Sequence, residues 1–338
     1  MSEGLFLKAY LAPLAPWFAR PDVTDILVNR PGEVWVETTH GALTREEAPD
    51  LTEVVLGRLG RQIAAVADQG VSREHPLLSA ALPDGSRVQL IAPPATRQGV
   101  ALAVRRHVIA DLGLEALEAG GLFDVTGEAA AEASDDGVLA ELLTTGNRPE
   151  FLRQAVRRGK TMVISGGTGS GKTTLLNALL KAIDPAERLI LIEDAPEVKL
   201  DRPNALGLLA VRGEQGEARV DADALLAAAL RMRPDRILLG ELRGREAFAF
   251  LRAVNTGHPG SITTVHADSP EGALDQIALL ALTSGVELSW PMARTYVRQL
   301  VEVVVQVSRR NGRRAVTDIL FRPRSTIDAA TGSSGSAA

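Results

Sequence analysis

Short apolar runs separated by polar turns dominate the first hundred residues and predict β-strands. Residues 24–29 and 34–37 are rich in β-branched side chains, and the Pro31-Gly32 pair between them favours a tight turn, so we expect a hairpin. Further strands and an edge are expected at residues 77–82, 87–92 and 100–105.

One segment of this region follows a helical pattern instead. Residues 51–66 place apolar side chains three or four positions apart, which is the spacing of one helical face. Asp50 followed by Glu53 has the pattern of a capping box at the start of that helix. Residues 1–108 are therefore a predicted small α+β domain.

From residue 159 to 325 the pattern alternates between buried strands and amphipathic helices. The predicted strands are residues 161–165, 189–194, 236–241 and 261–267. The predicted helices are residues 172–183, 221–232, 245–255 and 270–282. Such alternation is typical of an α/β domain with a mostly parallel sheet covered by helices. Residues 301–307 and 315–321, joined at Asn311-Gly312, predict a closing hairpin.

Two segments lack the apolar side chains needed for a core. Residues 109–158 predict a helical and flexible interdomain linker, because residues 126–137 are small and acidic with little to bury. Residues 326–338 are rich in Gly, Ser and Ala and predict a disordered tail.

Composition excludes several kinds of chemistry. The 338 residues suffice for two domains, and the net charge of -5 argues against non-specific nucleic-acid binding, which needs a basic surface. The chain has no cysteine, which excludes disulfides, thiolate nucleophiles and cysteine-ligated zinc. No apolar run approaches the ~18 residues of a membrane-spanning helix, so we expect a cytoplasmic protein whose membrane contact is peripheral.

The strongest motif lies between the strand at 161–165 and the following helix. It matches G-x-x-x-x-G-K-[ST] and consists of Gly166, Gly167, Thr168, Gly169, Ser170, Gly171, Lys172, Thr173 and Thr174. Backbone N–H groups of such a loop surround the β-phosphate, Lys172 reaches the β- and γ-phosphate oxygens, and Thr173 ligates Mg²⁺. The sequence therefore predicts a nucleoside triphosphate site with magnesium.

Polar residues end three other predicted strands, where an open α/β sheet presents its site. Glu241 ends the predicted strand at 236–241 and is a candidate to polarise the attacking water, with Gly240 where an aspartate is common. Glu193 and Asp194 could reach the magnesium or its waters, and His266 could donate a hydrogen bond to the γ-phosphate. The alternatives are a surface glutamate, a loop-solvating acidic pair and a structural histidine.

These motifs, in this order, resemble those of the secretion and traffic ATPases of the type II/type IV secretion superfamily. The shared motifs are the phosphate loop, Ile192-Glu-Asp194, Gly240-Glu241 and a histidine box from Thr256 to Ala267. Residues 28–37, 82–88 and 231–244 resemble the ATPases of type IV secretion systems most. Type II secretion ATPases typically carry a tetracysteine zinc element, which this chain cannot form.

The resemblance implies a RecA-like ATPase domain after the small α+β domain, with nucleotide bound between the two. It also implies a homohexamer at the cytoplasmic face of the inner membrane, partnered by inner-membrane secretion proteins and a coupling ATPase, with nucleic acid contacted only indirectly. Arg87, Arg105 and Arg106 match N-terminal arginines that approach the γ-phosphate in such proteins, and salt-bridged surface arginines are the alternative.

Other functions remain open from the sequence. A nucleotide-gated scaffold would bind ATP but barely hydrolyse it, and a pilus-assembly motor would use the same motifs. A nucleic-acid translocase of the same RecA-like class is disfavoured by the net charge. A small-molecule kinase fits least, because no separate acceptor pocket or lid can be recognised.

Overall fold

The computed structural model describes most of the chain. It covers residues 7–323 except positions 8, 42, 107–112, 120–122, 124–127, 212–215 and 311, and only the backbone of residues 128–135. The turn expected at Asn311 and the tail expected at 326–338 lie outside the described residues. The chain divides into two compact units, residues 1–108 with 185–241 and residues 109–184 with 242–338. The domain boundaries expected from the sequence stay a prediction.

The first unit contains an antiparallel sheet in the order β3-β2-β1-β6-β5-β4. Its strands are β1 (Val23–Val28), β2 (Gly32–Thr38), β3 (Leu43–Ala48), β4 (Leu77–Ala81), β5 (Arg87–Ile91) and β6 (Ala101–Arg105). The short helices η1 (Ala12–Leu14) and α2 (Ala15–Phe18) precede it. The expected hairpin is confirmed as β1 and β2, while β3 is an additional strand that the sequence did not indicate.

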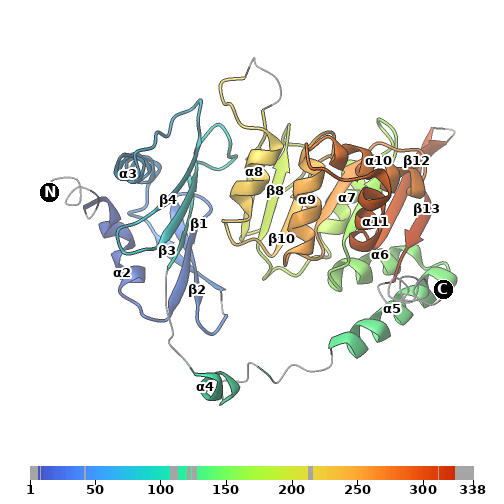
Figure 1. Cartoon of the computed structure of the whole chain (residues 1–338), viewed down its shortest axis with the longest axis horizontal. Helices are drawn as coiled ribbons and strands as arrows, with labels where there is room; N and C mark the ends of the chain where they lie inside the picture. Colours follow the sequence, from blue (N-terminus) through green and yellow to red (C-terminus); the bar gives the residue numbers. More distant parts are fainter. Residues whose placement is uncertain are drawn as a thin grey trace. The chain divides into compact units, whose positions relative to one another are not determined.

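Helix α3 (Glu53–Val66) packs on the core of this sheet through Leu56, Leu59 and Ile63 (Figure 1). Its N-cap is Thr52, whose side chain accepts a hydrogen bond from the Val55 amide at 3.3 Å. The expectation that Asp50 caps this helix was wrong. The chain makes a turn first, with Leu51 N–H donating to Ala48 O at 2.9 Å, and the helix begins only after it.

The first unit also contains three parallel strands and one helix. The strands are β8 (Leu189–Glu193), β9 (Ala205–Leu209) and β10 (Arg236–Leu239), and the helix is α8 (Ala222–Ala229). They lie in the order β10-β8-β9, and β8 and β10 are buried along their whole length. β9 is a strand that the sequence did not indicate.

A fully buried arginine joins the two parts of this unit. Arg188 donates to Asn29 Oδ1 at 2.6 Å, to Asn204 Oδ1 at 2.8 Å and to Met232 O at 2.9 Å. Complete burial, with a smaller contribution from the positive charge of Arg233, lowers the pKa of Arg188 to about 9. The hairpin β1–β2 is thereby hydrogen-bonded to the segment around β8.

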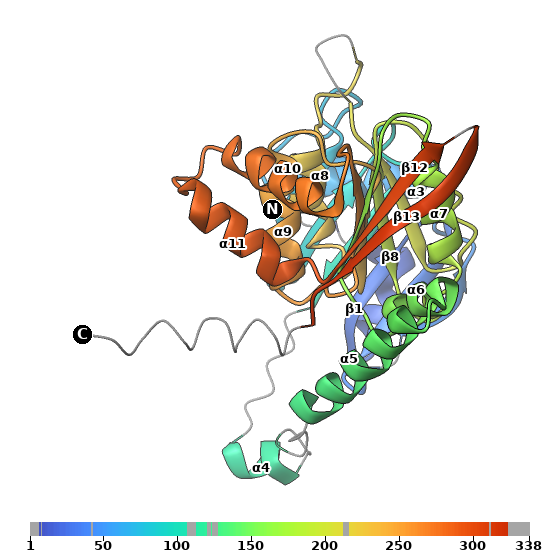
Figure 2. The same cartoon turned by 90° about the vertical axis from the view of Figure 1, so that its right-hand side faces the viewer.

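The second unit contains helices on both sides of a parallel core (Figures 1 and 2). Its strands are β7 (Met162–Ser165), β11 (Ile262–Val265), β12 (Val303–Arg310) and β13 (Arg313–Phe321). Its helices are α4 (Leu114–Ala119), α5 (Glu128–Thr144), α6 (Arg148–Arg157), α7 (Lys172–Leu180), α9 (Glu246–Asn255), α10 (Pro270–Leu282) and α11 (Trp290–Leu300). β7 lies between β11 and β12 and is parallel to both, and β13 closes the expected antiparallel hairpin. The mostly parallel arrangement is confirmed.

The segment expected to be a linker with little to bury is helical over much of its length. Helix α5 runs through residues 128–144, and Asp136 and Leu139 are buried. Asp136 Oδ1 lies 2.6 Å from Lys160 Nζ, which also donates to Glu302 Oε1 at 3.1 Å. The sequence did not indicate that Asp136 is buried, which is possible because a lysine neutralises its charge.

None of the helices in the described ranges is both long and apolar enough to cross a membrane.

Candidate functional site

The phosphate-loop motif adopts a backbone that depends on its glycines. The loop connects the end of β7 at Ser165 to the start of α7 at Lys172. Gly169 has a φ of 71° and Gly171 a φ of 107°, values in the left-handed region that residues with a Cβ rarely adopt. A Cβ at Gly166 would collide with the carbonyl oxygen of Val307. The loop therefore wraps closely against β12.

The polar groups of this loop fit an anion. Lys172 Nζ lies over the loop and donates to Gly166 O at 2.8 Å and to Gly167 O at 3.3 Å. Ser170 is buried, and its Oγ has no hydrogen-bond partner among the described residues. Helix α7 has no side-chain cap, and the N-terminus of a helix favours an anion. A buried hydroxyl, a lysine and the N-terminus of a helix are together a donor set suited to phosphate.

His266 follows β11 at the same edge of the sheet as this loop. β11 and β7 are parallel with Val265 opposite Ser165, so the residues after them emerge side by side. Ser165 Oγ and Gln306 Nε2 both donate to Ala267 O, at 3.3 and 3.1 Å, which fixes the backbone beside His266. The His266 side chain is exposed. The second unit thus brings His266 and the phosphate loop to one edge.

The two candidate acids of the first unit also come together. Glu193 ends β8, and Gly240 and Glu241 follow β10, whose last residue pairs with Ile192. Gly240 N–H donates to Ile192 O at 2.8 Å, and a Cβ at position 240 would lie 3.0 Å from Glu193 Cγ. Gly240, where an aspartate is common, therefore leaves room for the Glu193 side chain. Asp194 is exposed, and Glu241 is half-buried.

Glu193 has an arginine partner that sequence reasoning missed. Its carboxylate forms an ion pair with Arg97, which lies between β5 and β6. Its other oxygen accepts hydrogen bonds from the amides of Val198 at 2.9 Å and Glu197 at 3.3 Å. Burial lowers the pKa of Arg97. No local pattern around Arg97 marks it, because the contact depends on how a distant loop packs.

The three arginines singled out in the sequence occupy two different places. Arg87 and Arg105 are cross-strand neighbours, and with Arg231 they line a cavity of about 550 Å³. Arg105 Nε donates to Asp25 Oδ1 at 2.9 Å, although more than half of its side chain is exposed.

Arg106 lies elsewhere. Its Nη1 donates to the carbonyl oxygens of Arg20 and of Val23, the latter at 3.1 Å, and its guanidinium lies 5.9 Å from the Phe18 ring centroid. These contacts hold the end of β6 against the start of β1. The nucleotide-binding roles of all three arginines stay predictions.

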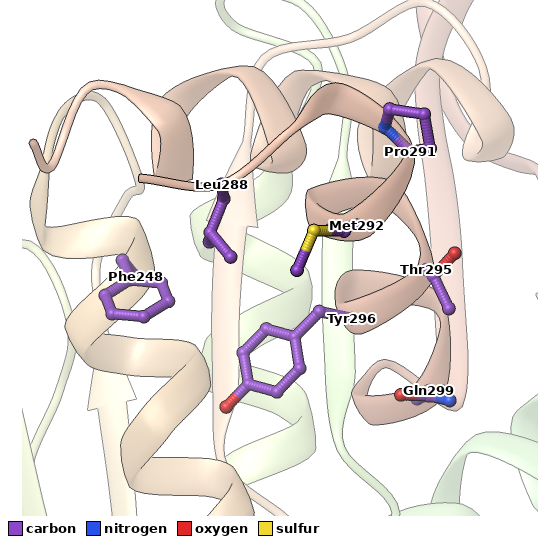
Figure 3. A pocket seen from close by; sticks show the side chains of 7 residues that line it. All are labelled: Phe248, Leu288, Pro291, Met292, Thr295, Tyr296 and Gln299. Carbon is purple, nitrogen blue, oxygen red and sulfur yellow. The ribbon is translucent and has the colours of Figure 1, made fainter. Parts of the chain in front are cut away.

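A separate hollow of about 490 Å³ lies between α9 and α11 (Figure 3). Leu288, Met292 and Tyr296 turn toward Phe248, and the Tyr296 and Phe248 ring centroids are 6.3 Å apart. None of the residues lining it belongs to the candidate site, and the lining is mainly apolar. The described residues that line it include no lysine or arginine, unlike the phosphate loop.

Comparisons with known proteins identify relatives of the whole chain. A family model described as "Type II/IV secretion system protein" matches residues 136–337. The chain is 41% identical over 326 residues to a Type IV secretion system protein PtlH homolog of Bordetella bronchiseptica, covering 93% of this chain and 94% of that protein. It is 37% identical over 328 residues to the Type IV secretion system protein VirB11 of Bartonella quintana, covering 93% and 92%.

A solved structure is similar over nearly the whole length. It is the crystal structure of the VirB11 ATPase from the Brucella suis type IV secretion system in complex with sulphate. The TM-score is 0.86 at 35% identity, and the match covers 95% of this chain and 99% of that one. The similarity therefore extends over both of the expected domains and not only the phosphate loop.

Proposed function

Because this chain belongs to the Type II/IV secretion system protein family, as a VirB11-like type IV secretion ATPase, we propose that it hydrolyses ATP to power type IV secretion. Its fold is the expected one, α/β with a RecA-like ATPase domain preceded by a small α+β domain. The observation that carries the proposal is the phosphate loop, with Lys172 bonded over it and the Ser170 hydroxyl left for a ligand.

The chain's own residues have distinct parts in this proposal. The amides of residues 166–174 and Lys172 hold the β- and γ-phosphates, and Glu241 orients and polarises the attacking water. His266 donates a hydrogen bond to the γ-phosphate. Arg87 and Arg105, with Arg106, supply positive charge from the N-terminal domain, as the resemblance implies.

Magnesium fits the same residues. Thr173 would hold it directly, and Glu193 and Asp194 partly through water, a set of oxygen donors that suits this ion. When bound, Mg²⁺ would neutralise phosphate charge. The unpartnered Ser170 hydroxyl and the close backbone approach at Gly166 suit a Mg²⁺–nucleotide complex bound in this loop.

We propose a homohexamer as the working form, at the cytoplasmic face of the inner membrane. The resemblance supports this assembly and this location. Inner-membrane secretion proteins and a coupling ATPase are the proposed partners. Substrate transfer and pilus assembly are both compatible with such a motor.

Phosphate release by the purified protein tests the proposal. Lys172→Ala and Glu241→Gln should each lower turnover by at least about a hundredfold, the size typical for loss of one charge-stabilising or water-orienting group. Lys181→Ala, at the exposed end of the same helix, is the matched control and should leave turnover unchanged. Wild-type protein that binds ATP but releases phosphate no faster than Lys172→Ala would favour the scaffold function instead.

A further inference from the structure

The loop between β5 and β6 pairs with the edge strand β9. Thr96 forms an antiparallel bridge with Leu208, Arg97 N–H donates to Gly207 O at 2.9 Å, and Leu209 N–H donates to Ala95 O at 2.9 Å. Backbone bonds on both sides of residue 96 fix the direction in which the loop runs. The backbone of Arg97 is therefore fixed, and with it the direction in which its side chain leaves the loop.

From this point the Arg97 side chain passes over a glycine. A Cβ at Gly207 would lie 2.6 Å from Arg97 Cδ and 3.1 Å from its Nε. Because position 207 has no side chain, the arginine can lie flat over β9 and reach the neighbouring strand β8. Its Nη1 donates to Val198 O at 2.9 Å, and its Nη2 forms the ion pair with Glu193.

The pair lies almost entirely out of water. The Glu193 side chain is 4% exposed and that of Arg97 is 14% exposed. One Glu193 oxygen is held by the amides of Val198 and Glu197, and the other by Arg97. Water screens a buried ion pair little, and together with the two amide hydrogen bonds the pair restrains the orientation of the carboxylate.

We propose that Arg97 is a positioning residue for Glu193, and that through it the turnover of ATP depends on the loop between β5 and β6. This inference rests on the proposed ATPase function. Arg97 acts on the acid and not on the nucleotide, which separates it from Arg87 and Arg105. A change that moves this loop would release Glu193 and slow the chemical step while leaving the phosphate loop intact.

Steady-state ATP hydrolysis by Arg97→Met and Arg97→Lys tests the proposal. Arg97→Met should lower kcat at least tenfold and leave KM for ATP within twofold, and Arg97→Lys should restore part of kcat. In a Glu193→Gln background, Arg97→Met should change kcat by less than twofold, because the acid that it positions is already gone. Arg73→Met is the matched control, since Arg73 pairs with Glu217 at the surface and should leave kcat unchanged.

A second variant covers the case in which Arg97→Met fails to fold. Gly207→Ala removes no charge but places a methyl group in the path of Arg97, and it should lower kcat with unchanged KM. The inference is overturned if folded Arg97→Met has a kcat within twofold of the wild type. It is also overturned if Arg97→Met lowers kcat by the same factor in the Glu193→Gln background as in the wild type. Either result leaves the ATPase function standing. Wild-type protein without turnover overturns both.

Discussion

Each of the two compact units contains a buried ion cluster at the end of a strand. Arg97 and Glu193 meet at the carboxyl end of β8 in the first unit. Lys160 meets Asp136 and Glu302 just before β7 and β12 begin, in the second unit. Open α/β sheets bind ligands at the carboxyl ends of their strands. We therefore expect the first cluster to serve chemistry and the second to stabilise the fold.

The two clusters also differ in what they hold together. Lys160 joins helix α5 to the strands, and Glu302 Oε2 accepts from the Thr161 amide at 3.0 Å. Burial by itself would lower the pKa of Lys160, but the hydrogen bond to Asp136 and the charge of Glu302 outweigh it and raise the pKa. A similar pairing of charges therefore fastens a helix in one unit and orients a candidate catalytic acid in the other.

The largest expected effect is on stability, from Lys160→Met. Removing the lysine leaves two carboxylates buried without their cation, which typically costs about 3–5 kcal/mol. Urea denaturation should show this loss at pH 7. Because the pKa of Lys160 is raised above 10.5 in the folded state, the difference from the wild type should be complete below that pH and shrink as the lysine deprotonates above it.

If the Lys160 cluster only stabilises the fold, folded Lys160→Met should still hydrolyse ATP. Turnover per folded molecule of Lys160→Met should stay within twofold of the wild type, and Lys181→Met should be neutral in both assays. A tenfold fall in the kcat of folded Lys160→Met would show that the cluster of Lys160, Asp136 and Glu302 also serves chemistry. The contrast between the two clusters would then be lost.

An intermediate effect is expected from Gly240→Asp, which introduces the aspartate that is common at this position. A Cβ there lies 3.0 Å from Glu193 Cγ, so the new carboxylate would crowd and repel the acid that Arg97 holds. Overpacking of this kind costs about 1–3 kcal/mol. Turnover should fall at least tenfold, and Gly240→Ala, which adds crowding without charge, should reduce it less. Raised turnover in the Gly240→Asp variant would contradict this account of the Glu193 environment.

The sequence predicted the features that depend on local pattern. β7, β8 and β10 were found because they are largely apolar runs buried on both faces, and β11 (Ile262-Thr-Thr-Val265) because β-branched residues favour a strand. β3 was missed because Leu43-Thr-Arg-Glu-Glu-Ala48 is an edge strand with charged side chains. α11 was missed because Pro291 suggests a break in a helix, whereas here it lies in the first turn, where proline is tolerated.

The same distinction applies to the candidate site. The phosphate loop is a contiguous motif whose glycines and lysine follow from the chemistry of phosphate binding, so it could be read directly. The pairing of Arg97 with Glu193 needs the loop at 95–97 to add to β9 and Gly207 to leave a path. Neither condition has a local signature in sequence. Contacts between distant segments therefore decided which arginine reaches this acid.

The smallest expected effect comes from Thr52→Ala, which tests whether a modest loss of stability alone slows turnover. Thr52 caps α3, far in sequence from either ion cluster, and loss of such a cap costs about 1 kcal/mol. Urea denaturation should show this loss for Thr52→Ala and none for Asp50→Ala, because Asp50 does not cap the helix. Turnover of both variants should equal the wild type. If Thr52→Ala alone slowed ATP hydrolysis tenfold, a modest loss of stability would be enough to affect turnover, and the slow turnover expected for Gly240→Asp could no longer be assigned to Glu193.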